Sequence, residues 1–319
     1  MVKKDSTGTM KKIQYLFEYL LMLMLLGLVD ILPVSVSEAL VGGLAEAWYF
    51  LSSRRRSIAV ENILTSGICA DPAEAARIAR RSFRHFGLVI LESLRSFRAL
   101  QGEHWRDLVE MNFSPEIEKI LMDPKQGVIV ATGHLGSWEI AGQLISLVKP
   151  VVAVARRMNN PYVNNLMSRR KPRERFQTIS KYGDGNTGRF LQVLKGGNVL
   201  GLMIDQHASW GGMMVDFFGK PASTYRTSAL LHLVTGAPLC FLYCRRKKDH
   251  KYEIIAKGPF YYKRSGDRDA DARRILTDMT RELEDAIRTV PDQYLWGHRR
   301  WKAVTSAQND TLPCGRPTQ

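Results

Sequence analysis

The residues of this chain whose types and spacing suggest chemistry are His134 and Glu139, which lie five positions apart in the stretch GHLGSWE. An apolar run, VIVAT, leads into this stretch, and a helical pattern of apolar residues follows it. On an unbroken helix a spacing of five turns the second side chain away from the first, since each residue rotates by about 100°. With His134 in a turn and Glu139 in the first turn of a helix, the carboxylate can reach back to the imidazole.

Such a pair suits proton transfer. A carboxylate on one imidazole nitrogen fixes the tautomer and stabilises the imidazolium, so that the other nitrogen takes a proton from a hydroxyl group. The spacing therefore predicts a general base, His134, with Glu139 as its orienting carboxylate. A histidine near a glutamate is also a common structural pair, and geometry rather than spacing decides between the two readings.

Signatures of other chemistries do not occur in the sequence. It contains neither the GxSxG pattern of serine hydrolases nor the HExxH pattern of zinc hydrolases. Its cysteines show no CxxC spacing, which argues against a zinc cluster or a disulfide framework and predicts a reduced chain facing the cytosol. They are Cys69, Cys240, Cys244 and Cys314.

Short β-rich runs alternate with helical patterns through the middle of the chain, which predicts an α/β fold with a mixed sheet flanked by helices. Functional sites in such sheets lie beyond the carboxyl ends of strands, where His134 and Asp205 are expected. The predicted strands are 127–132, 151–155, 199–204, 213–217, 238–243 and 252–256. The predicted helices are 72–100, 137–148, 161–170, 223–235 and 271–290.

The N-terminal region is apolar. Residues 13–32 read IQYLFEYLLMLMLLGLVDIL, with four lysines before them and no small-residue cleavage site after them. We expect an uncleaved membrane anchor, either spanning or lying in the interface, although a buried core helix would show a similar pattern. The basic run Arg54 to Arg56 fits a cytoplasmic membrane surface, or an ordinary solvated turn. We divide the chain into a membrane-associating region (1–50), an α/β domain (51–304) and a polar tail (305–319).

The charge of the chain predicts anionic partners. Its 319 residues carry 46 Lys and Arg against 31 Asp and Glu, a formal net charge of +15. The stretch 151–195 holds ten basic residues and two acidic ones. Guanidinium groups there suit phosphate or carboxylate, unless the stretch is simply a solvated basic face. A nucleic-acid-binding protein is the alternative class, but the aromatic residues of this stretch are scattered, no binding motif is present, and the N-terminus is apolar.

Several ordered motifs point to one family. GHLGSWE resembles the His, four residues, acidic motif of glycerolipid-type acyltransferases, and most of the chain resembles the lipid A late (secondary) acyltransferase family. The other segments that carry the resemblance are ARRMNNP, which contains Arg156, Asn159, Asn160 and Pro161, then DQHASWGGMMVDFFGKPAST from Asp205, TGAP from Thr235, and PDQYLWGHRRWK from Pro291.

The resemblance implies an α/β acyltransferase fold behind an N-terminal membrane helix, on the cytoplasmic face of the inner membrane. It implies acyl transfer from a thioester, with acyl carrier protein as the favoured donor and partner, to a hydroxyl of a lipid A precursor, an anionic glycolipid. No metal or other cofactor is expected, and no nucleic acid. His134 would be the base and Glu139 its orienting carboxylate. The expected substrate-binding residues are Arg156, Arg173, Asp205, Gln206 and Arg299.

The sequence departs from the family pattern at one position and leaves two alternatives open. Arg226 stands where the family pattern has a glycine, which affects the expected shape of the local pocket. The same mechanism would serve another glycolipid acceptor, or coenzyme A as the carrier of the acyl group.

Overall fold

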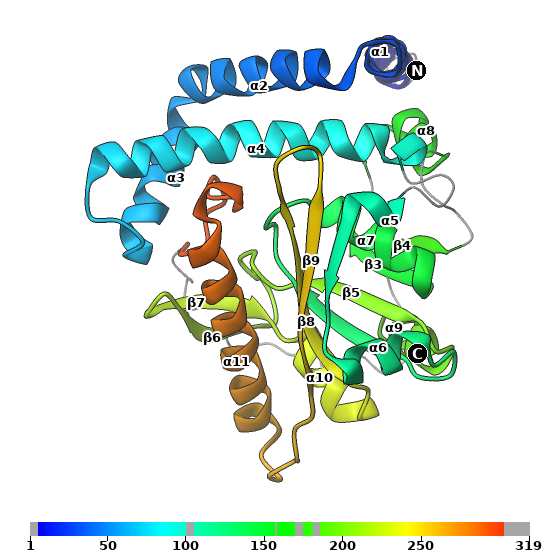
Figure 1. Ribbon diagram of the computed structural model, residues 1–319, viewed down its shortest axis with the longest axis vertical. Coiled ribbons are helices and arrows are strands. Elements are labelled where there is room, and N and C mark those ends of the chain that lie inside the picture. The colour runs from blue at the N-terminus through cyan, green and yellow to red at the C-terminus, as the bar shows by residue number, and fades with distance from the viewer. Residues whose placement is uncertain (1–5, 100–104, 157, 170–174, 181–185, 303–319) are drawn as a thin grey trace.

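The computed structural model is a central sheet with helices on both faces and two N-terminal helices lying across one end (Figure 1). It describes residues 6–99, 105–156, 158–169, 175–180 and 186–302. The predicted fold class is confirmed. The predicted domain division remains a prediction, and the tail from residue 303 lies outside the described residues.

The main sheet has seven strands within the described residues, in the order β1-β9-β8-β2-β5-β3-β4. The five strands from β8 to β4 run parallel, whereas β9 is antiparallel to β8 and parallel to β1. The bounds are β1 Val109–Asn112, β2 Val128–Thr132, β3 Val151–Ala155, β4 Phe176–Ser180, β5 Val199–Met203, β8 Leu239–Arg246 and β9 Tyr252–Phe260.

The parallel strands form where the chain is almost continuously apolar. Strands β2, β3 and β5 read VIVAT, VVAVA and VLGLM, the pattern of strands that helices cover on both faces. Alternate residues enter two separate cores: Val128 and Val130 pack with α7 on one face, whereas Ile129 and Ala131 pack with α10 and α11 on the other. The short strands β1 and β4 were not predicted, because their exposed polar positions hide the apolar pattern.

The expected place of the strand 213–217 in the main sheet was wrong. Within the described part of the chain, strand β6 (Gly212–Phe217) pairs with β7 (Lys220–Tyr225), in an antiparallel hairpin separate from the main sheet. Phe218 and Gly219 form its turn with φ of 51° and 70°, as a two-residue hairpin loop requires. The predicted helix start at 223 was also wrong, because residues 223–225 belong to β7.

The helices are α1 Ser6–Ile31, α2 Val34–Leu51, α3 Ser53–Ser66, α4 Pro72–Ala99, α5 Trp105–Leu108, α6 Pro115–Met122, α7 Trp138–Val148, α8 Pro161–Arg169, α9 Asn186–Lys195, α10 Thr227–Thr235 and α11 Arg268–Thr289, followed by the 3₁₀ turn η1 Pro291–Gln293. In Figure 1 the long helix α4 lies between the sheet and the N-terminal helices α1 and α2.

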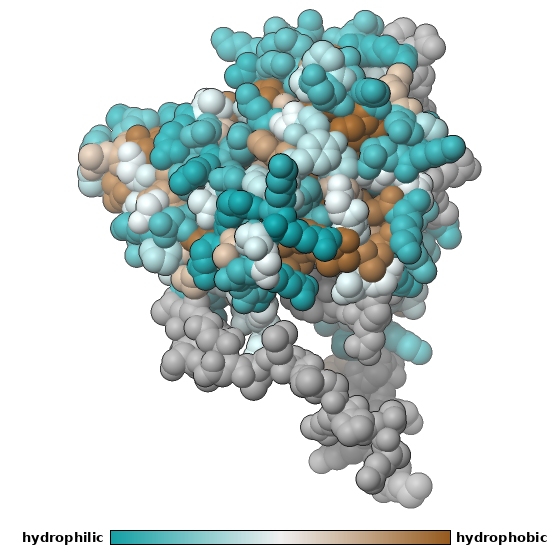
Figure 2. Space-filling view, turned by 90° about the horizontal axis from the view of Figure 1, so that it is seen from below, coloured by the Kyte–Doolittle hydropathy of each residue, from teal (hydrophilic) through white to brown (hydrophobic). Residues whose placement is uncertain are grey.

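Helix α1 is apolar and exposed over most of its length. The most apolar 18-residue window within Met10–Ile31 has a mean hydropathy of 1.6, and 6% of this window is buried. Length and composition therefore allow this helix to cross a membrane. Helix α2 adds exposed apolar side chains, including Leu44, Trp48 and Leu51. The opposite end of the molecule is largely hydrophilic, with smaller hydrophobic areas (Figure 2). The exposed apolar surface of α1 and α2 is the part of the protein that a membrane would contact, and it is here called the membrane-facing end.

Candidate active site

His134 lies in a turn whose backbone is held by residues from the end of the chain. The carbonyl of His134 accepts a hydrogen bond from the Leu295 amide at 3.0 Å, and the Gly136 amide donates to the Gln293 carbonyl at 2.9 Å. Gly136 has a φ of 62°, and a Cβ there would lie 1.8 Å from the carbonyl oxygen of Cys244. Only glycine fits this position, so the turn has one well-defined shape.

The ring of His134 faces the carboxylate of Asp205. The Nδ1 atom lies 2.9 Å from Oδ1 of Asp205, and the His134 amide donates to Oδ2 at 2.9 Å. Strands β2 and β5 are parallel neighbours with Thr132 opposite Met203, so their carboxyl ends bring the two residues together across 71 positions of sequence. The two side chains therefore meet at the carboxyl ends of the strands, where the sequence predicted them to lie.

Asp205 is the anionic partner of the ring. Burial would raise the pKa of its carboxyl group, but the charge of His134 and the hydrogen bonds from its ring and amide bring that pKa below its usual value. A carboxylate only accepts hydrogen bonds, so Nδ1 carries the proton and Nε2 carries the lone pair. The amide nitrogen of Gln206 lies 3.4 Å from Nε2, an arrangement that fits this tautomer.

Nδ1 of His134 thus has Asp205 as a partner, which the spacing argument did not consider because Asp205 is distant in sequence. The predicted orienting role of Glu139 is not tested by this contact. Glu139 lies in the first turn of α7 and follows Trp138, whose indole meets the imidazole edge to face with centroids 5.1 Å apart. Whether Glu139 is catalytic stays a prediction.

The predicted substrate-binding residues lie at different depths. Gln206 lies at the ring of His134, as described, whereas the exposed Arg156 follows the carboxyl end of β3. Arg173 lies outside the described residues. Arg299 is exposed, and its predicted role remains a prediction.

The sequence analysis missed Arg300, the neighbour of Arg299. Its side chain is 2% exposed and donates to the Ser223 carbonyl and to Oγ1 of Thr224, each at 2.6 Å. Its charge also contributes to the lowered pKa of Asp205. Arg300 therefore joins the β6–β7 hairpin to the site. The segment HRRW was visible in the sequence, but nothing in it distinguished the buried arginine from the exposed one.

His298 is a second histidine near the ring of His134. Its Nε2 accepts a hydrogen bond from the His207 amide at 3.1 Å. Burial lowers the pKa of His298 to about 4, so it is neutral near pH 7. A positive charge on His298 would oppose protonation of His134. Because His298 is neutral, it adds no such charge.

A buried ionic network supports the start of α7. Ser137 donates to Oε2 of Glu92 at 2.6 Å, and Nε of Arg246 donates to Oε1 of the same carboxylate at 2.6 Å. Arg246 also reaches Glu38 on α2 at 2.5 Å. The first residues of α7 are thereby connected through α4 and β8 to the second N-terminal helix.

Comparison with known proteins identifies the family. The family model of the bacterial lipid A biosynthesis acyltransferases matches residues 5–303. The chain belongs to this family. It is 24% identical to the lipid A biosynthesis palmitoleoyltransferase of Escherichia coli (strain K12) over 254 residues, which are 78% of this chain and 79% of that protein. It is also 24% identical to the lipid A biosynthesis lauroyltransferase of the same strain over 282 residues, 87% of this chain and 89% of that protein.

This acyltransferase has a narrow apolar cavity, here called the α7 slot, between α7 and the sheet. Its volume is about 120 Å³, and Trp138 and Glu139 lie at its end nearest His134. Alternate residues of the parallel strands form the opposite wall, among them Ala153 of β3 and Gly201 of β5. Gly201 has no side chain, which leaves room in the slot: a Cβ there would have its nearest neighbour, Cα of Ala153, at 3.9 Å.

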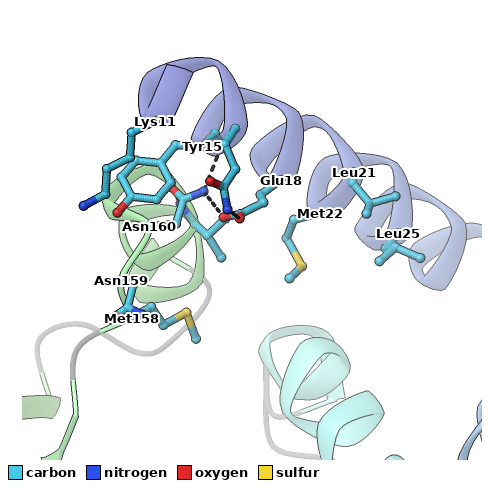
Figure 3. A pocket seen from close by; sticks show the side chains of 11 residues that line it. Lys11, Tyr15, Glu18, Leu21, Met22, Leu25, Met158, Asn159 and Asn160 are labelled. Carbon is cyan, nitrogen blue, oxygen red and sulfur yellow. Dashed lines mark hydrogen bonds between the residues drawn. The ribbon is translucent and has the colours of Figure 1, made fainter. Parts of the chain in front are cut away.

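Asn160 joins helix α1 to the acyltransferase domain (Figure 3). Its side-chain oxygen accepts from the amides of Tyr162 and Val163 at 3.0 and 3.3 Å and so caps α8. Its side-chain nitrogen donates to the Tyr15 carbonyl at 2.8 Å and to Glu18 at 2.9 Å. The Asn-Asn-Pro segment thus connects the N-terminal helix to the region that follows Arg156.

Proposed function

We propose that this protein transfers an acyl chain from an acyl thioester to a hydroxyl group of a lipid A precursor, with His134 as the general base. The observation that carries the proposal is the hydrogen bond between Nδ1 of His134 and Asp205. It assigns the proton to Nδ1 and leaves the basic lone pair on Nε2, beside an apolar slot that suits an acyl chain.

The reaction is a direct transfer. Nε2 of His134 takes the proton of the acceptor hydroxyl while the hydroxyl oxygen attacks the thioester carbonyl carbon. The tetrahedral intermediate then collapses with cleavage of the carbon–sulfur bond, and the imidazolium returns its proton to the leaving thiolate. The buried carboxylate of Asp205 stabilises the imidazolium between these two steps. General base catalysis of this kind contributes roughly 10²- to 10⁴-fold.

The α7 slot is the proposed site of the donor acyl chain. Its lining is mostly apolar, and it ends beside Trp138, whose ring contacts His134. At about 120 Å³ it is smaller than most ligand pockets, which measure about 300 to 1,000 Å³, so a long chain would have to widen it. Helix α7 forms one wall and is the part that would move, because the parallel strands of the other wall are hydrogen-bonded to one another.

Acyl carrier protein is the proposed carrier of the donor chain. Carrier proteins of this class are acidic, and the net charge of +15 on this chain would attract such a partner. The exposed Arg156, between β3 and the capped start of α8, lies in the basic stretch that would meet its phosphate-bearing arm. Coenzyme A carries similar phosphate groups and is the alternative donor.

We place the enzyme on the cytoplasmic face of the inner membrane. The apolar helix α1 would anchor it, and the exposed arginines Arg54 and Arg55 lie just after α2, where anionic lipid headgroups would attract them. The acceptor hydroxyl would then come from the membrane and the donor thioester from the cytoplasm.

A single-turnover assay tests the function. Detergent-purified protein is mixed with a tetraacylated lipid A precursor and a radiolabelled acyl group carried either by acyl carrier protein or by coenzyme A. We expect transfer from acyl carrier protein by the native protein and by the control Asp216→Asn, whose carboxylate is exposed, and loss of transfer in His134→Ala.

Each other result contradicts a stated part of the proposal. Transfer by His134→Ala at the native rate would exclude the general base. Transfer from coenzyme A alone would exclude the carrier protein. Transfer from neither donor would exclude a lipid A precursor as the acceptor.

A further inference from the structure

A second apolar cavity, here called the α2–α4 groove, lies between helices α2 and α4. Its volume is about 550 Å³, within the range of about 300 to 1,000 Å³ that is typical of ligand sites. Leu295, Gly297 and His298 lie at its inner end. Apolar side chains from both helices form its walls, among them Leu44 and Trp48 of α2, and Phe86 and Ile90 of α4.

The inner end of the groove adjoins the catalytic histidine. Leu295, which lines the groove, donates its amide hydrogen bond to the His134 carbonyl. Phe86 stacks on Trp138 with centroids 5.9 Å apart and an interplanar angle of 24°, and Trp138 also contacts the imidazole of His134. Phe86 lines the groove and Trp138 lines the α7 slot, so these two stacked rings lie between the two apolar cavities.

The outer end of the groove opens on the membrane-facing surface. Leu44 is 70% exposed, Trp48 59% and Ile90 50%, although all three are large and apolar. They lie beside the exposed apolar surface of α1 and α2. A hydrocarbon chain in the membrane could enter such a groove without passing through water.

A positive charge lies at one side of the groove. Arg55 lines it and donates from Nη1 to the Gly297 carbonyl at 2.9 Å. The neighbouring Arg54 is exposed. Guanidinium groups bind phosphate through two parallel hydrogen bonds, so an apolar channel with an arginine beside it matches a phosphorylated lipid.

We propose that the α2–α4 groove binds one hydrocarbon chain of the acceptor lipid, with a phosphate of that lipid near Arg55. This inference rests on the proposed function, because it concerns the second substrate of the same reaction. The acceptor is the occupant that fits, since it comes from the membrane and carries both chains and phosphate. The donor chain arrives from the cytoplasm and has the α7 slot on the other side of Trp138.

The test compares two pairs of substitutions on α2. The groove variant is Leu44→Gln with Trp48→Gln, and the control is Leu40→Gln with Leu51→Gln, which changes two exposed apolar residues of the same helix that do not line the groove. All four side chains are exposed, so both variants should fold. Each removes apolar surface from the membrane-facing side, so a difference between them reports on the groove itself.

Two rates are measured in detergent micelles. One is transfer as a function of acceptor concentration, and the other is hydrolysis of the donor thioester without acceptor. We expect the groove variant to raise the acceptor KM at least about tenfold relative to the control, because removing two large apolar contacts weakens binding by more than that factor. Donor hydrolysis should be the same in both.

The outcomes that contradict the inference differ from those that contradict the function. An equal acceptor KM in the two variants would overturn the groove as the acceptor site while the native enzyme still transfers. No transfer by the native enzyme would instead overturn the proposed function. A photoreactive phenylalanine derivative at position 48 identifies the occupant: crosslinking to labelled acceptor supports the inference, and crosslinking only to phospholipid overturns it.

Arg55→Gln tests the position of the phosphate. With acceptors that carry or lack phosphate, the native enzyme should prefer the phosphorylated one, and the variant should lose at least about threefold of that preference. Arg54→Gln is the matched control, since it removes the same charge from a residue that does not line the groove. An equal loss of preference in both variants would mean that general surface charge, rather than Arg55, attracts the phosphate.

Discussion

The α7 slot and the α2–α4 groove lie on either side of Trp138, but they are built from different parts of the molecule. One wall of the slot is the parallel sheet, in which β2, β5 and β3 are hydrogen-bonded along their length. The groove lies between two helices, one of which belongs to the membrane-facing end. The slot is also much smaller, at about 120 Å³ against about 550 Å³.

This difference matters for selectivity. In the slot only α7 can move, because the opposite wall of paired strands keeps its shape, so the slot can discriminate between acyl chains that differ by a few methylene groups. In the groove both walls are helices that can separate, which suits a branched lipid with several chains. We therefore expect donor selectivity to be strict and acceptor selectivity to be broad.

The largest effect should come from changing Asp205, because the proposed catalytic centre serves both cavities. Asp205→Asn removes the negative charge that stabilises the imidazolium and allows the wrong tautomer of His134, so we expect transfer to fall about 10²- to 10⁴-fold. KM should change little for either substrate, because both cavities stay intact. Single-turnover rates measure this, with Asp216→Asn as the control. A large change in one KM alone would show that Asp205 belongs to one cavity rather than to the shared centre.

The second-largest effect should be the destabilisation by acid of α4, the helix between the groove and the turn that carries His134. Burial, aided by the charge of Arg246, lowers the pKa of His85 on α4 to about 4, although a hydrogen bond with Gly136 and the charge of Asp292 raise it. The folded protein therefore keeps His85 neutral, whereas the unfolded chain takes up a proton below about pH 6.5. Stability from this residue is complete above that pH and is lost as the pH falls to about 4, at a cost of about 3 kcal/mol.

Denaturant unfolding at pH 7 and pH 4.5 measures this loss. His85→Gln should reduce the difference between the two pH values, whereas Ser209→Ala, at an exposed residue without a titratable group, should leave it unchanged. An undiminished pH dependence in His85→Gln would show that other groups, such as His298, cause it.

Filling the slot should change chain selectivity without affecting the acceptor. Gly201→Val adds a three-carbon side chain where the backbone leaves space, so the preferred donor chain should become shorter by about two methylene groups. The ratio of kcat/KM for long and short chains should shift by roughly tenfold, because two buried methylene groups contribute about 1.6 kcal/mol. The control is Gly188→Val on the exposed side of α9. A shift in acceptor KM instead would mean that the roles of the two cavities are reversed.

The smallest effect should come from the contact that holds α1 to the domain. Asn160→Ala removes the cap of α8 and the hydrogen bonds to Tyr15 and Glu18, for a loss of roughly 1 to 2 kcal/mol. Proteolysis within residues 6–31 should become faster, while chain selectivity stays the same. Asn159→Ala, at the exposed neighbour, is the control. Equal protease sensitivity in the two variants would show that α1 is held elsewhere.

The sequence predicted the parts of the fold and site whose signals are local. The apolar strands β2, β3 and β5 and the apolar helix α1 were found because each is a continuous run of one residue class. The contact between the ring of His134 and Asp205 was not predicted, because it depends on which strands are neighbours in the sheet. Arg300 was missed for the same reason: its burial depends on the hairpin against which it packs, and the sequence around it looks like an exposed basic run.

The turn that carries His134 is held by the Gln293 carbonyl and the Leu295 amide, and this has a consequence for the order in which the protein is made. During synthesis, α1 and α2 leave the ribosome before residues 291–300, so on the proposed membrane location they can meet the membrane while the last part of the chain is still missing. The sheet can form around His134 in that time, but its turn lacks the hydrogen bonds that fix it. The growing chain would therefore reach its lipid before it can consume a thioester, and catalysis would start only once residues 291–300 have folded back onto the domain.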